Sequence, residues 1–241
     1  GGILSQGGVV LAAGYRRGPV APGSIVSLFG QKFAQAEAFA TDKPLPTSLG
    51  GVRVLIGGRP APLFYVGPEQ INAQVPFELD PDRQLQALVE SSGLPSAPEP
   101  LQTASNHPGI FTLGGAYGSQ GAILIANTDR LAMPVTPGVP SEPAAAGGYL
   151  SIYCTGLGPT DPTIPSGQPG PADPPAVVKT PVAVTVGEQP ARVIFAGLAP
   201  GFVGVYQVNV QVPEGVAPGN AVPVVITQGN FRSNTATIAV R

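Results

Sequence analysis

The sequence predicts an all-β fold made of two tandem immunoglobulin-like (IPT/TIG-like) β-sandwich domains. Two observations predict it: short β-branched runs bounded by glycine or proline, and an internal repeat. Such runs recur at roughly the 8–12-residue spacing that is typical of a sandwich. Clear examples are 24–29 (SIVSLF), 52–56 (VRVLI), 182–186 (VAVTV) and 222–227 (VPVVIT).

Local patterns support strands over helices. Residues 205–212 (VYQVNVQV) alternate apolar and polar side chains, and this period of two puts Val208, Val210 and Val212 on one face of a strand. Gly57-Gly58 and Gly187-Glu188 each follow a strand and predict tight hairpin turns. Only residues 32–40 suggest a helical turn, and a loop is an equally good interpretation there.

An internal repeat sets the number of domains. Residues 52–66 (VRVLIGGRPAPLFYV) resemble residues 182–196 (VAVTVGEQPARVIFA), with an offset of 130. Residues 71–76 (INAQVP) resemble residues 208–213 (VNVQVP), with an offset of 137. The second copy therefore holds seven extra residues, which we place around 197–204.

The repeat predicts four segments. Residues 1–18 form an N-terminal strand or tail, residues 19–106 the first immunoglobulin-like domain, and residues 144–241 the second. Residues 107–143 connect the two domains. Because this connection holds a strand-like run of its own, 121–126 (GAILIA), we expect it to dock on a domain and make the pair rigid.

The composition restricts the classes of partner. The chain is 43% hydrophobic and 11% charged, so it can bury a core despite its 33 glycines and 30 prolines. No basic stripe is present, which argues against nucleic acid as a partner. No apolar run approaches the roughly 20 residues that span a bilayer, so we expect no membrane insertion.

The residues that carry catalysis are too few to predict an enzyme. His107 and Cys154 are the only histidine and cysteine, and a strand sequence around Cys154 favours a buried structural thiol over a nucleophile. Two such ligands cannot complete a closed zinc site. Glu78, Asp80 and Asp82 lack the glycine of a calcium loop, and a solvated turn is the simpler interpretation. We therefore expect no catalytic centre, no metal and no cofactor.

Several long phrases resemble one protein family. They run in order along nearly the whole chain and are similar to an uncharacterised bacterial C-terminal domain family of Solibacter-type acidobacteria. The resemblance implies a module of large secreted or surface proteins, and so an extracellular or cell-surface location. It implies no catalytic activity and no cofactor, and it supplies no functional residues. The phrases are 21–30 (APGSIVSLFG), 45–54 (LPTSLGGVRV), 61–78 (APLFYVGPEQINAQVPFE), 107–113 (HPGIFTL), 153–162 (YCTGLGPTDP) and 195–227.

The first thirteen residues, GGILSQGGVVLAA, allow two interpretations. In the first, residues 9–13 form the first strand of the first domain and residues 1–6 are a tail. In the second, the segment leaves its own domain and adds as a strand to the open sheet edge of a neighbouring copy, with Gly7-Gly8 as the hinge. The side chains that would contact the neighbour are Ile3, Leu4, Val9, Val10 and Leu11.

These observations lead to one functional expectation and two alternatives. We expect an extracellular structural protein whose main partner is itself, assembled head to tail into a filament, because heterologous contacts generate open assemblies. One alternative is a surface adhesion module that binds glycans, which the lack of tryptophan and the six tyrosines weaken. The other alternative is a passive surface stalk that spaces other domains.

Overall fold

The computed structural model describes residues 1–241 and is almost entirely β-sheet. Its only helical element is one 3-10 turn, η1 (Gly115–Tyr117). Residues 32–40 form no helix; they are a loop that leads into the short strand β3 (Ala38–Phe39). The all-β part of the prediction is confirmed. None of the helical structure has the length and apolar character needed to cross a bilayer.

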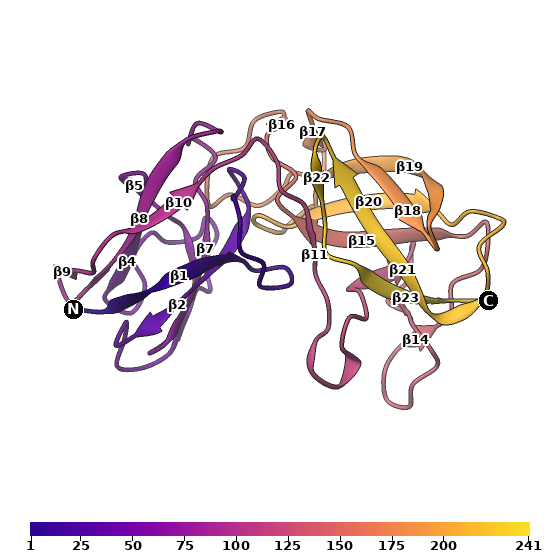
Figure 1. Cartoon of the computed structure of the whole chain (residues 1–241), viewed down its shortest axis with the longest axis horizontal. Helices are drawn as coiled ribbons and strands as arrows, with labels where there is room; N and C mark the ends of the chain where they lie inside the picture. Colours follow the sequence, from indigo (N-terminus) through magenta and orange to yellow (C-terminus); the bar gives the residue numbers. More distant parts are fainter.

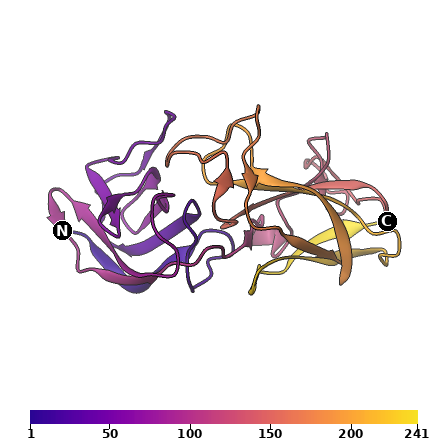
Figure 2. The ribbon, with the colours of Figure 1, turned by 90° about the horizontal axis from the view of Figure 1, so that it is seen from above.

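The molecule has two lobes, which lie side by side along its long axis with the termini at opposite ends (Figures 1 and 2). The first lobe holds residues 1–104 and the second lobe residues 109–241. A hydrophobic core of 19 buried residues fills the first, and a separate core of 24 fills the second. Each lobe therefore buries its own apolar side chains.

Two sheets form the first lobe. The first has the order β1-β2-β7-β6-β3, and the second has the order β10-β8-β4-β5, with β9 paired to β8. Alternation along β4 sends its valines inward and Arg53 outward. The strands are β1 (Ile3–Leu11), β2 (Ile25–Gln31), β4 (Val52–Ile56), β5 (Arg59–Pro60), β6 (Leu63–Val66), β7 (Gln70–Gln74), β8 (Gln84–Ser91), β9 (Leu94–Pro95) and β10 (Glu99–Gln102).

The second lobe has one continuous ladder, because β19 belongs to both of its faces. The first half of β19 pairs with β18 and its second half pairs with β20. The main strands are β12 (Ile123–Ile125), β15 (Tyr149–Thr155), β18 (Ala183–Val186), β19 (Gln189–Leu198), β20 (Tyr206–Gln211), β21 (Gly219–Gln228) and β23 (Ala236–Val240). The short strands are β11 (Gly109–Ile110), β13 (Leu131–Ala132), β14 (Ser141–Glu142), β16 (Thr160–Asp161), β17 (Val177–Val178) and β22 (Phe231–Arg232).

The same strand order occurs in both lobes. The path β1-β2-β7-β6 of the first lobe matches β12-β15-β20-β19 of the second, and β10-β8-β4 matches β23-β21-β18. Even an irregularity repeats: the register shifts between Leu63 and Tyr65 in β6, and between Val193 and Phe195 in β19. The two related sequences therefore fold with a common topology.

The segment 107–143 is part of the second lobe and not a separate connection. Its strand β12 pairs with β15, as β1 pairs with β2 in the first lobe. Ile110, Ile123 and Ala132 lie in the second core. The lobe therefore extends from about residue 109, well before the expected start at 144. The strand-like run 121–126 is expected to dock on a domain, but the repeat gives no sign that it belongs to the sheet of the second lobe.

Candidate functional site

The N-terminal segment forms an edge strand of its own lobe. Strand β1 pairs only with β2: Ile3 and Leu4 lie opposite Gln31 and Gly30, and residues 9–11 lie opposite residues 28–26. A bulge separates these two stretches, as expected where a strand carries adjacent glycines. Strand β1 thus runs over 3–11, longer than the 9–13 of the simpler sequence interpretation.

The five residues predicted for strand addition differ in exposure. Leu4, Val9, Val10 and Leu11 are buried, whereas 54% of Ile3 is exposed. The structure therefore brings these residues into the sheet of their own chain. Strand addition to a neighbouring copy stays a prediction, and it requires β1 to leave β2.

Hydrogen bonds between buried groups hold the two lobes together. The Thr155 hydroxyl accepts a bond from the Ile25 amide at 2.9 Å and donates one to the Gly204 carbonyl at 2.8 Å. The buried Gln74 side chain accepts a bond from the Gly167 amide at 2.7 Å. Satisfied polar groups at a buried contact resist separation, because each would otherwise lose its partner away from water. The junction is therefore a built interface and not a flexible tether.

A carboxylate adds a second contact to this junction. The Glu78 carboxylate accepts bonds from the hydroxyl and the amide of Ser166, at 2.6 and 3.2 Å. Burial raises the pKa of Glu78, but hydrogen bonds from Ser166 and from the backbone of Glu78, together with the charge of Arg59, leave the pKa below its usual value. The charged form of Glu78 thus supports the contact between the lobes.

His107 and Cys154 are both buried and pack against neighbouring groups. The His107 ring faces the Pro19 carbonyl and lies edge-on to Phe231. Cys154 is fully buried in the second core, and this burial raises the pKa of its thiol, the opposite of what a nucleophile needs. No three His, Cys, Asp or Glu side chains lie close enough together to hold a metal ion.

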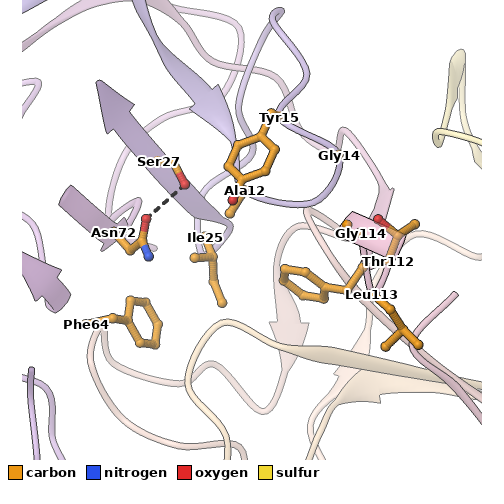
Figure 3. A pocket seen from close by; sticks show the side chains of 12 residues that line it. Ala12, Gly14, Tyr15, Ile25, Ser27, Phe64, Asn72, Thr112, Leu113 and Gly114 are labelled. Carbon is orange, nitrogen blue, oxygen red and sulfur yellow. Dashed lines mark hydrogen bonds between the residues drawn. The ribbon is translucent and has the colours of Figure 1, made fainter. Parts of the chain in front are cut away.

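A cleft of about 550 Å³ opens between the lobes (Figure 3). The first lobe contributes Tyr15, Ser27, Phe64 and Asn72, and the second lobe contributes residues 111–115. None of the residues lining the cleft is charged. Apolar rings with a few fixed polar groups are typical of a site for a small neutral ligand.

No motif in the sequence marks this cleft. Its two walls come from residues about 40 to 100 positions apart, so only the fold brings them together. A partial signal was present: Gln70 and Asn72 recur as Gln207 and Asn209 in the second copy, and both pairs make the same side-chain hydrogen bond at 2.9 Å. A polar pair kept in both copies could have marked this face of the sheet.

Comparisons with known proteins show only distant likeness. No family model matches the chain, and no curated protein matches its sequence. Among solved structures, a surface glycan-binding protein from Prevotella bryantii is 12% identical, with a TM-score of 0.29; the match covers 98% of this chain and 42% of that protein. Domains 5–6 of the S-layer protein SbsC are 10% identical, with a TM-score of 0.26 and coverage of 100% and 98%. The I9–I11 tandem of titin is 8% identical, with a TM-score of 0.24 and coverage of 92% and 61%. At such low scores these likenesses assign neither a family nor a function.

Proposed function

We propose that the chain is an extracellular structural protein of two immunoglobulin-like (IPT/TIG-like) domains, which assembles head to tail through its N-terminal strand. The observation that carries the proposal is the position of β1 at the edge of its sheet, where β2 is its only ladder partner. A strand held by one neighbour along a bulged ladder is the element most easily exchanged between copies.

The second lobe has a counterpart of β1 at the same strand position. There β12, which precedes the rest of the repeated strands in sequence, lies beside β15. The repeat thus takes its first strand from the segment upstream of it. An upstream segment from another copy would meet the same row of backbone groups on β2.

Exchange of β1 between copies would change the free energy little, because the swapped β1 makes the same contacts with the β2 of a neighbouring copy that it makes with its own. Gly7 lies in the bulge with a φ of 63°, a conformation that suits glycine. A transfer from each copy to the next gives an open filament.

A disulfide that locks β1 to its own β2 tests this mechanism. Ile3 and Gln31 lie opposite each other near the end of the ladder and both are exposed. In an oxidised Ile3→Cys/Gln31→Cys variant we expect monomers only, and in the reduced variant we expect wild-type filaments. Light scattering and negative-stain electron microscopy, with and without reductant, measure both.

The matched control is Arg53→Cys/Glu90→Cys, which locks opposed residues of β4 and β8 and leaves β1 free. This variant should assemble in both redox states. Filaments of the oxidised Ile3→Cys/Gln31→Cys protein equal to those of the wild type would refute strand addition. A wild type that stays monomeric would instead support the passive stalk.

A further inference from the structure

We propose that the cleft between the lobes binds a neutral carbohydrate chain, a role separate from self-assembly. The cleft takes one wall from each lobe, so its shape depends on the hydrogen-bonded junction described above. Three properties of the walls carry the inference: a fixed amide donor, accessible aromatic rings and the absence of charge.

The amide donor belongs to Asn72. Its side-chain oxygen accepts hydrogen bonds from the Ser27 hydroxyl and from the Gln70 amide, both at 2.9 Å. These two bonds fix the orientation of the side chain, so its NH₂ group is left without a protein acceptor and faces the cleft (Figure 3). A donor held in place before binding suits a ligand oxygen, since little side-chain freedom is lost on binding.

Aromatic rings lie around this donor. Tyr15 is 61% exposed and is supported by the Phe29 ring, with 5.8 Å between the ring centroids. Phe64 is the residue at which β6 shifts register, and this bulge turns its ring toward the cleft (Figure 3). Such surfaces match the C–H faces of a pyranose ring, while the free hydroxyls of Tyr15 and Thr112 match its hydroxyl groups.

Charge and backbone geometry distinguish a saccharide from other ligands. Because the lining holds no Lys, Arg, Asp or Glu, nothing there offsets the charge of a phosphate, a carboxylate or an amine. A peptide binding as an added strand would need a free ladder edge. Ser27 lies on β2 and Asn72 lies on β7. Both strands are paired on both sides, so neither has free backbone groups to which a peptide strand could pair.

The second lobe provides an internal control. Asn209 accepts the same 2.9 Å bond from Gln207, and Ser151 lies opposite it, as Ser27 lies opposite Asn72. At the bulge, however, Ile194 takes the place of Phe64. The polar pair is therefore common to both lobes, whereas the ring that stacks on a sugar belongs to the first lobe.

Affinity electrophoresis tests the proposal with the full chain. Native gels are cast with α-glucan, β-glucan, xylan, mannan or galactan, and with alginate as the anionic comparison. We expect the wild type to be retarded by at least one neutral polymer and not by alginate. Tyr15→Ala and Asn72→Ala should weaken the retardation at least tenfold, and Phe64→Ile, which installs the residue of the second lobe, should do the same.

Two variants are matched controls. Asn209→Ala removes the equivalent amide of the second lobe, and Tyr149→Ala removes a tyrosine that is 49% exposed outside the cleft. Both should be retarded like the wild type. If Asn72→Ala unfolds, the exposed Tyr15 still provides the test.

Three results would overturn the proposal: no retardation by any neutral polymer, retardation by alginate alone, or equal losses in the control variants. The locked Ile3→Cys/Gln31→Cys monomer should still be retarded by the same neutral polymer, because the cleft does not depend on assembly. Binding without assembly, or assembly without binding, therefore separates this proposal from the proposed function.

Discussion

Single buried polar residues determine how the lobes meet. Thr155 is fully buried and joins Ile25 of the first lobe to Gly204 of the second through one hydroxyl. Gly204 lies in the seven-residue insertion that the repeat places around 197–204. The sequence predicts this insertion, because the offset between the two copies changes there. The offset does not predict that Gly204 accepts a hydrogen bond at the junction between the lobes.

His107, which faces the Pro19 carbonyl, predicts that the stability of the protein depends on pH. Burial lowers its pKa, the nearby Arg16 lowers it further, and the Pro19 carbonyl raises it in part. Because the folded protein favours the neutral ring, protonation stabilises the unfolded chain. We therefore expect the free energy of unfolding to decrease as pH falls below about 6.5, the usual value for histidine.

Urea unfolding of the wild type and of His107→Gln between pH 7.5 and 5.5 measures this effect. The chain has no other histidine, so the wild type should lose stability across this range and the variant should lose less. Parallel losses in the two proteins would show that His107 is not responsible.

At the scale of elements, the bulge in β1 sets how firmly this strand is held. A Cβ atom on Gly8 would lie 2.5 Å from the Phe29 carbonyl oxygen and 2.7 Å from that of Ser5. Both contacts are with backbone, which cannot move away without disturbing the ladder. Gly8→Ala should therefore destabilise the protein by about 1–3 kcal/mol, the usual cost of overpacking.

Chemical denaturation measures this cost, and Gly219→Ala is the matched control. Gly219 also lies in a strand, but the nearest atom to its added Cβ is a side-chain carbon of Val222 at 3.5 Å. We expect this control to stay within about 0.5 kcal/mol of the wild type. An equal loss in both variants would mean that the tight bulge is not what makes Gly8 necessary.

The elements also show what the sequence could reveal. The strands at 52–56 and 182–186 were predictable, because their valines alternate and the two copies reinforce each other. Strand β12 is only three residues long, so its place beside β15 depends on tertiary pairing. The register shift at Phe64 likewise depends on the pairing of β6 with β7, and the sequence pattern around Phe64 does not predict it.

At the scale of the whole molecule, two separate cores and a hydrogen-bonded junction make an elongated body with its termini at opposite ends (Figure 1). In the proposed exchange, the donated strand β1 and the acceptor strand β2 both lie in the first lobe. The cleft between the lobes would then recur along the filament and present many weak sugar sites together, which raises the overall avidity.

The most direct test of the account is the mass of the wild-type chain in solution as a function of concentration. Multi-angle light scattering should give a mass that rises with concentration well above the 24.3 kDa of one chain, without a fixed limit, because head-to-tail transfer has no closed end point. A mass of one chain at every concentration, or a closed dimer that grows no further, would contradict it.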